Sequence, residues 1–179
     1  MNQPLSFPGA TRPLVLIVDD NSANLLMLGD LLDGTYRVRL AKSGEQALSA
    51  ALLEPQPDLI LLDIMMPDMD GYEVITRLRA QPLTAHIPVI YVTAKGAGDE
   101  EAYGLGLGAA DYIAKPINPD VMLARVQAHV NLKRMRDGLL AQNSWLEHEV
   151  ARRAKENLPR PEGGPGRPPP RPAPPACPR

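Results

Sequence analysis

The chain has 179 residues, 44% of them hydrophobic and 4% aromatic, which allows one domain with an aliphatic core plus an appendage. Its single cysteine, Cys177, excludes a disulfide framework or a cysteine metal site and fits a reducing compartment. The N-terminus lacks the apolar core of a signal peptide, and no segment has the roughly 20 apolar residues that cross a bilayer. We therefore expect a cytoplasmic protein with no membrane partner.

Charge is divided unevenly along the chain. Residues 1–128 hold 9 Lys and Arg against 16 Asp and Glu, whereas residues 129–179 hold 10 against 5. An acidic domain followed by a basic appendage predicts two parts with different roles. The alternative is a globular domain followed by a solvated tail whose basic charge has no separate role.

Short apolar runs alternate with helical patterns from Leu14 onward. The predicted strands are 14–18, 36–41, 58–63, 87–94 and 110–114. The predicted helices are 22–32 with Ser22 as its cap, 43–53 with a capping box at Ser43 and Gln46, 71–80, 99–108, and one that begins at Asn118 and Pro119. Five buried strands joined by helices predict an α/β fold, in which a parallel sheet has helices on both faces.

The last predicted helix is too long for the domain that contains it and can continue to about Leu158. Apolar residues follow a heptad-like spacing with polar residues at two seam positions, namely Leu132, Met135, Leu139, Gln142, Leu146 and Glu149. This pattern resembles a short coiled coil, and a solvated linker helix explains it equally well. We expect residues 13–130 to form the main domain and residues 131–158 a helical linker.

Both ends of the chain differ from this pattern. Residues 1–12 are expected to be a disordered arm. Residues 159–179 contain ten of the 20 prolines of the chain, together with several arginines. Such a composition cannot form a packed core, so this tail is expected to be disordered.

Chemically distinctive residues follow the predicted strands. Asp19 and Asp20 follow the first strand, Asp63 ends the third, Thr93 ends the fourth, and Lys115 with Pro116 ends the fifth. In a parallel sheet these strand ends converge on the functional crevice. Each residue alone is an ordinary loop residue, but their joint placement at one edge indicates a site.

This set of residue types suits phosphoryl transfer. Clustered carboxylates repel one another unless a cation balances them, and carboxylate oxygens are ligands that Mg²⁺ accepts. Lys115 adds a second positive charge, and Thr93 supplies a hydroxyl for a phosphoryl oxygen. A carboxylate among them is able to accept the phosphoryl group as an aspartyl phosphate.

From about Leu14 to Val130 the sequence resembles the receiver domains of two-component response regulators. The resemblance lies in LIVDDN, LLDIMMPDMDGYEV, VIYVTA and LGAADYIAKPI, and in their order. It implies a flavodoxin-like fold with five parallel strands. It also implies that the chain is a phosphoacceptor signalling protein and not an enzyme acting on other substrates.

The resemblance implies a role for each site residue. Asp63 is the expected phosphoacceptor, and Asp20, Asp63 and the backbone carbonyl of Met65 are the expected Mg²⁺ ligands. Asp19 is expected to act through a metal-bound water. Thr93 and Lys115 are expected to bind phosphoryl oxygens, Tyr112 to be the switch aromatic, and the bond before Pro116 to be cis.

The resemblance also implies partners. A sensor histidine kinase or a phosphotransfer protein is the expected phosphodonor. The face formed by the fourth helix, fifth strand and fifth helix, together with the extended helix, is expected to pair with a second copy. No nucleic-acid partner is expected.

The segment after the receiver has a second resemblance, to the linker that precedes HD-GYP-type cyclic di-GMP phosphodiesterase domains. No His–Asp pair or G-Y-P follows in this sequence. The tail looks like coding sequence read in a shifted frame. The resulting hypothesis is a truncated or frameshifted member of that group, and a native tail would contradict it.

Two other functions are alternatives to a phosphorylation switch. An aspartyl-phosphate hydrolase of the dehalogenase class needs a D-x-D pair, and Met65 stands where the second acid would be. A dimerisation scaffold that never reacts is the second rival. Asp68 and Asp70 are expected to be loop and cap residues, and the glycine run 104–108 a helix end. His86, His129 and His148 are scattered in sequence and predict no site.

Overall fold

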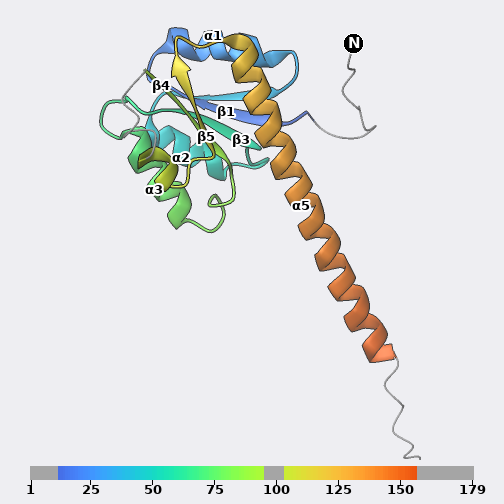
Figure 1. Ribbon diagram of the computed structural model, residues 1–179. Helices are drawn as coiled ribbons and strands as arrows, with labels where there is room; N and C mark the ends of the chain where they lie inside the picture. Colours follow the sequence, from blue (N-terminus) through green and yellow to red (C-terminus); the bar gives the residue numbers. More distant parts are fainter. Residues whose placement is uncertain (1–11, 95–102, 157–179) are drawn as a thin grey trace, which may run out of the picture. The chain divides into compact units, whose positions relative to one another are not determined.

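In a computed structural model, which describes residues 12–94 and 103–156, the chain forms a five-stranded parallel sheet with helices on both faces (Figure 1). The strand order is β2-β1-β3-β4-β5. The strands are β1 (Leu14–Val18), β2 (Arg37–Ala41), β3 (Leu59–Asp63), β4 (Val89–Ala94) and β5 (Asp111–Lys115). The helices are α1 (Ser22–Asp33), α2 (Gly44–Leu52), α3 (Gly71–Ala80) and α5 (Pro119–Glu156). The predicted α/β, flavodoxin-like architecture is confirmed.

Some predicted segments lie outside the described residues. These are the arm at 1–11, the start of the fourth helix at 99–102, the last two residues of the long helix and the tail at 159–179. Residues 103–106 are helical, and Gly108 follows with a φ of 96°. The glycine run therefore ends a helix, as predicted, because a positive φ is a conformation that glycine adopts without a steric penalty.

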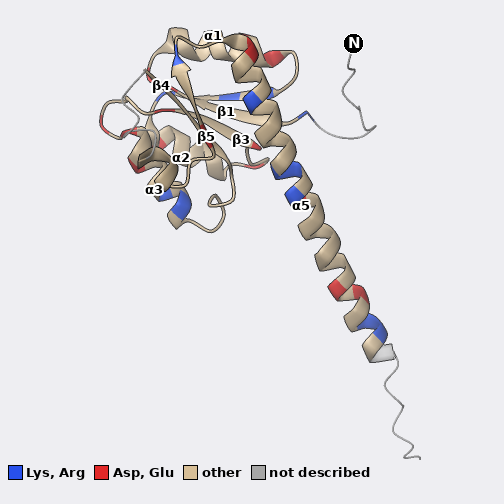
Figure 2. Cartoon of the chain, in the orientation of Figure 1, with Lys and Arg blue, Asp and Glu red and all other residues tan. Residues whose placement is uncertain are grey.

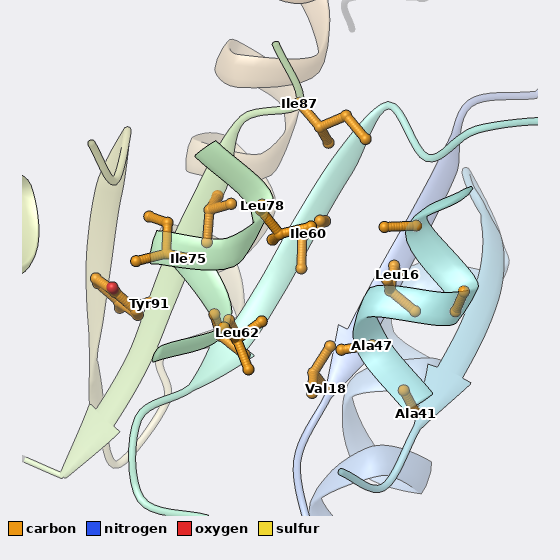
Figure 3. Close-up of a cluster of buried hydrophobic side chains, with 14 of the residues drawn as sticks. Leu16, Val18, Ala41, Ala47, Ile60, Leu62, Ile75, Leu78, Ile87 and Tyr91 are labelled. Carbon is orange, nitrogen blue, oxygen red and sulfur yellow. The ribbon is translucent and has the colours of Figure 1, made fainter. Parts of the chain in front are cut away.

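The two faces of the sheet bury separate apolar clusters. α2 and α3 cover one face, where Ala47, Ile75 and Leu78 pack on alternate residues of β1 and β3 (Figure 3). α1 and the first part of α5 cover the other face, where Leu28 and Val126 pack on the intervening strand residues. Every residue of β1 and β3 is buried, because both strands lie inside the sheet and have a helix layer on each side.

Four strands have boundaries that differ from the predictions. The third strand begins at Leu59 and not at Asp58. Tyr36 was predicted to begin the second strand, but its N–H donates to the carbonyl of Leu32 and so closes the preceding helix. The fourth strand begins at Val89, after Pro88, whose carbonyl accepts from the N–H of Ile60. The fifth strand is shifted by one residue, to Asp111–Lys115.

Side-chain caps fix where the helices begin. The prediction of Ser22 as the cap of α1 is wrong, because Asn21 is the N-cap and its side chain accepts from the N–H of Ala23. Ser43 caps α2 as predicted, although Gln46 bonds the N–H of Lys42 and not that of the cap residue. An extended residue with a side-chain acceptor satisfies amide groups that the first turn leaves unpaired.

α5 is the longest helix, with 38 residues. Asn118 precedes it and accepts from the N–H of Asp120 at 3.0 Å, and Pro119 is its first residue, as predicted. The chain divides into two compact units, the first ending at Leu139 and the second beginning at Leu140. Among the described helices, none is both long enough and apolar enough to cross a membrane.

Gly71 begins α3 where the chain has no room for a side chain. A Cβ at this position would lie 2.6 Å from the carbonyl oxygen of Asp63 and 2.8 Å from the Cα of Ile64. Both atoms are backbone, so relief requires the β3–α3 loop to move.

We expect Gly71→Ala to lower the free energy of unfolding by about 1–3 kcal/mol, because the added methyl group overpacks the backbone behind Asp63. Gly29→Ala is the matched control, since a Cβ there meets nothing within 4 Å. It should raise the free energy of unfolding by about 0.5–1 kcal/mol through helix propensity. Urea unfolding of both variants measures the difference, and equal stability of Gly71→Ala and the unchanged chain would contradict the steric account.

Candidate functional site

The carboxyl ends of four strands meet at one edge of the sheet. Asp19 and Asp20 directly follow β1, and Asp63 is the last residue of β3. Thr93 is the fifth of the six residues of β4, and Lys115 ends β5, where it is in register with Ala94. The parallel register of the strands thus gathers the residues that the sequence predicted to lie together.

Three carboxylates form a cluster at this edge. Asp19, Asp20 and Asp63 each offer an oxygen, and these oxygens lie within 4.8 Å of one another. Asp19 and Asp63 are 1% and 5% exposed, whereas Asp20 is exposed. Two of the three charges are therefore removed from water. Carboxylates repel each other more strongly in the protein interior than in water.

Lys115 joins the two buried carboxylates. Its Nζ lies 3.1 Å from Oδ2 of Asp63 and 3.2 Å from Oδ2 of Asp19. Burial alone would lower the pKa of Lys115, but hydrogen bonds and charge interactions with Asp63 and Asp19 outweigh it, so the pKa lies above its ordinary value. The lysine is therefore held in its charged form between the two acids.

The positive charge of Lys115 does not fully compensate for the burial of Asp63. Burial raises the pKa of Asp63, and the negative charge of Asp19 adds to that rise. The hydrogen bonds from Lys115 and from the N–H of Met65 act in the opposite direction without cancelling it. One lysine facing three carboxylates leaves a negative site, which favours a further cation.

The described chain thus supplies a donor set that fits Mg²⁺. Its side-chain donors are three carboxylates, two of them fixed by the packing of the sheet and one open to solvent. Mg²⁺ binds oxygen ligands and keeps several waters, so one or two carboxylates and an exposed rim suit it better than a closed cage.

Asn24 holds Asp19 in place, and sequence reasoning missed it. Its Nδ2 donates to both carboxylate oxygens of Asp19, at 3.1 Å and 2.9 Å. The N–H of Asn21 donates to Oδ1 of Asp19 at 2.9 Å. The available signal was that Asn24 is in the first turn of α1, the helix that begins directly after the acid pair.

The β3–α3 loop turns sharply around Asp63. The N–H of Met65 lies 3.4 Å from Oδ1 of Asp63, while the Met65 side chain is 73% exposed. Asp68 has a φ of 65°, and Asp70 caps α3 by accepting from the N–H of Glu73 at 2.8 Å. Asp70 is thus a cap, as predicted, and neither Asp68 nor Asp70 belongs to the acid cluster among the described residues.

Thr93 is near the end of β4 and Tyr112 near the start of β5, and neither belongs to the acid cluster among the described residues. The Thr93 hydroxyl donates to the carbonyl of Ala94 at 3.0 Å. Tyr112 is partly buried against the α2–α3 side of the core, and the guanidinium of Arg125 lies 5.8 Å from the centre of its ring. Arg125 also pairs with Asp111. The Lys115–Pro116 peptide bond is cis.

Comparison with known proteins agrees with this geometry. The family model of the response regulator receiver domain matches residues 15–127. A Vibrio cholerae protein named "Probable cyclic di-GMP phosphodiesterase" is 43% identical over 152 residues, which are 85% of this chain and 34% of that protein. The response regulator PleD of Caulobacter vibrioides is 40% identical over 126 residues, which are 70% of this chain and 28% of PleD. The chain thus spans about a third of the length of these curated relatives.

Solved structures give the same result. The chemotaxis protein CheY4 of Vibrio cholerae superposes with a TM-score of 0.62 at 30% sequence identity, covering 66% of this chain and 98% of CheY4. Receiver domains are phosphorylated by histidine kinases, and this chain has an acid cluster of Asp19, Asp20 and Asp63 with Lys115 beside it. The chain belongs to the response regulator receiver domain family of two-component signalling.

Proposed function

We propose that Asp63 accepts a phosphoryl group in a Mg²⁺-dependent reaction and that the resulting acyl phosphate switches the conformation or partner state of the chain. The contact of Lys115 Nζ with both Asp63 and Asp19, at 3.1 Å and 3.2 Å, carries this proposal. It places a cation against Asp63, the carboxylate that ends the central strand β3. The donor would be a sensor histidine kinase or a phosphotransfer protein.

Asp20, Asp63 and the backbone carbonyl of Met65 would hold the metal, and Asp19 would contact it through water. The hydrogen bonds of Asp19 support its indirect role, because each of its oxygens accepts two of them. Among the described residues, each oxygen of Asp63 accepts only one. Asp20 is exposed and so open to direct ligation. When bound, Mg²⁺ neutralises negative charge on the acids and on the incoming phosphoryl group.

The chain's own part in the reaction is positioning and charge. A carboxylate oxygen of Asp63 attacks the phosphorus atom, and the bond from phosphorus to the donor nitrogen breaks with its electron pair leaving on that nitrogen. Lys115 stabilises negative charge on the transferring group. Hydrolysis of the acyl phosphate by water releases inorganic phosphate and restores the Asp63 carboxylate. Self-phosphorylation and self-dephosphorylation are therefore the only reactions expected of this chain.

Thr93, Lys115 and Tyr112 would transmit the change. After phosphorylation, the Thr93 hydroxyl would leave the carbonyl of Ala94 for a phosphoryl oxygen, and Lys115 would exchange one carboxylate for the new phosphate. These shifts bias the ends of β4 and β5, and Tyr112 lies three residues before Lys115 on β5. A side chain that is only partly buried can adopt a second packing at small cost, which is what a two-state switch needs.

We propose a second copy of this chain as the partner of α5. The apolar side chains of the heptad-like seam, Leu132, Met135, Leu139 and Leu146, are between 46% and 62% exposed. Their spacing supports a coiled coil that extends the pairing of the face around β5 and α5. In this proposal residues 13–130 form the receiver, and residues 131–158 form the linker.

The relative named as a cyclic di-GMP phosphodiesterase matches both the receiver and part of the linker, because the matched 152 residues exceed the receiver alone. We place this chain in the same group on that basis. The signal would then pass from Asp63 through α5, whichever effector receives it.

Asp63→Asn should abolish labelling by acetyl phosphate in the presence of Mg²⁺, because the amide is not a nucleophile toward phosphorus. Asp68→Asn is the matched control, since it makes the same change five residues away at an exposed position whose positive φ asparagine tolerates. It should label normally. Phosphorylation is measured by the slower migration of the phosphorylated chain in a phosphate-binding gel, which should occur for Asp68→Asn and not for Asp63→Asn. Retained labelling of Asp63→Asn would reassign the acceptor, and no labelling of the unchanged chain would favour an unreactive scaffold.

Lys115→Met should lower the free energy of unfolding without Mg²⁺ by about 1–3 kcal/mol at neutral pH, because Asp19 and Asp63 lose their cation while buried. Added Mg²⁺ should stabilise this variant more than the unchanged chain, since the metal no longer competes with the lysine. Thermal unfolding with and without Mg²⁺ measures both effects. Equal free energies of unfolding for the two proteins without metal would show that Lys115 does not stabilise the buried carboxylates.

Thr93→Val should bind the aspartyl-phosphate mimic beryllofluoride with Mg²⁺ but fail to change oligomeric state. The unchanged chain should shift toward a dimer under the same conditions. Valine has the shape of threonine without the hydroxyl, so the strand is kept and the proposed bond to a phosphoryl oxygen is lost. Thr76→Val, on the exposed face of α3, is the control and should still shift. Light scattering reports the state, and a normal shift in Thr93→Val would exclude the hydroxyl from the switch.

A further inference from the structure

A cavity lies at the opposite end of the sheet from Asp63. It has a volume of about 470 Å³, and its walls include Pro88, directly before β4, and Ala110, directly before β5. Thr93 and Lys115 lie at the other ends of these two strands. The cavity therefore belongs to the amino edge of the sheet and shares no residue with the acid cluster.

The cavity is lined by cations. Arg79 from α3 and Lys133 and Arg136 from α5 contribute to its wall, together with His86 and His129, and none of its lining residues is acidic. Figure 2 shows Lys and Arg on α3 and along the middle of α5. Segments 50 residues apart in the chain meet here, since Arg136 donates to the carbonyl of His86 at 2.8 Å.

Nearby carboxylates do not balance this charge in the described part of the chain. Asp137 lies 2.6 Å from Lys133 and 3.6 Å from Arg136. Asp58 lies 3.7 Å from both Lys133 and Arg134. Three lining residues are cations, namely Arg79, Lys133 and Arg136. Asp58 is shared with Arg134, which does not line the cavity, and Asp111 beside the lining His129 is paired with Arg125. Asp58 and Asp137 therefore leave at least one positive charge in excess at the wall of the cavity.

Arg79 and Arg136 have different roles in this wall. Arg79 donates to the carbonyls of Ala85, Ile87 and Gly108 at 2.9–3.2 Å, so it fixes two loops and contributes a stationary charge. Arg136 uses only Nη2 for its contacts with His86 and Asp137. In the part of the chain that the structure describes, Nε and Nη1 of Arg136 have no hydrogen-bond partner. They can donate to a ligand in the fork geometry that matches a phosphate group.

His86 senses the same positive charge. Burial lowers the pKa of its imidazole, and the charges of Lys133, Arg136 and Arg79 lower it further, whereas Asp137 acts in the opposite direction. An anion placed among these cations would raise the pKa of His86 again. The ring therefore offers a direct spectroscopic report of anion binding.

We propose that this cavity binds a small phosphate-bearing molecule of about mononucleotide size. The excess positive charge and the open fork of Arg136 select the phosphate. Ile87, Pro88 and Ala110 supply an apolar wall for the rest of the ligand. The volume lies within the range of roughly 300–1,000 Å³ that small-molecule sites occupy in proteins.

The test is a calorimetric titration of the full chain with adenosine 5′-monophosphate in EDTA, which keeps Mg²⁺ from recruiting the anion to the acid cluster. We expect saturable binding of one molecule per chain, tighter than that of inorganic phosphate. Arg136→Gln should weaken it by about 10- to 100-fold, as expected for loss of a charged hydrogen bond. Arg136 is half exposed on a helix, so the substitution leaves the core intact.

Arg134→Gln is the matched control, because it removes the same charge from the same helix turn but does not line the cavity. It should weaken binding far less than Arg136→Gln. In NMR spectra the imidazole signals of His86 should shift on titration, and those of His148 should not. The proposal is overturned if adenosine 5′-monophosphate shows no saturable binding up to about 10 mM, or binds no more tightly than inorganic phosphate. It is also overturned if Arg134→Gln and Arg136→Gln weaken binding equally, or if the His86 signals do not shift.

Discussion

The receiver depends on one electrostatic constraint, which is the burial of Asp19 and Asp63 beside a single lysine. Two carboxylates that are 1% and 5% exposed would repel each other at the end of an apolar sheet. Lys115 lies within 3.2 Å of both and holds them together. Because that lysine leaves excess negative charge, the site is ready for a divalent cation and, with it, a phosphoryl group.

The remainder of the fold keeps this arrangement from relaxing. β1 and β3 are buried along their whole length, so neither acid can withdraw toward water without disturbing two helix layers. Asn24 fixes both oxygens of Asp19, and Gly71 lets α3 begin directly behind Asp63. Rigidity at the acids and a partly buried Tyr112 beyond them are what a switch requires, since a small local change must choose between two packings.

The sequence predicted the parts of the molecule that follow from periodicity and strand order. Alternating apolar runs indicate the parallel sheet, and the convergence of parallel strand ends at one edge predicts that Asp63 and Lys115 lie together. Ser22 was predicted as a cap because serine and asparagine are nearly equal in that role, and only the backbone shows that Asn21 precedes the helix.

What the sequence could not predict depends on how separate elements pack. His86 and His129 are scattered in sequence, yet the docking of α5 against the α3–β4 loop brings both to one cationic cavity. Asn24 contacts Asp19 only because of the angle at which α1 leaves β1. No periodic pattern encodes such contacts, since they join residues of different elements through tertiary geometry.

The most direct test is chemical identification of the phosphorylated residue. The chain is phosphorylated with acetyl phosphate and Mg²⁺, the acyl phosphate is reduced with borohydride, and peptides are sequenced by mass spectrometry. The account predicts that Asp63 alone is converted to homoserine and that omission of Mg²⁺ prevents the conversion. Homoserine at Asp19 or Asp20, or conversion of Asp63 without a divalent cation, would contradict it.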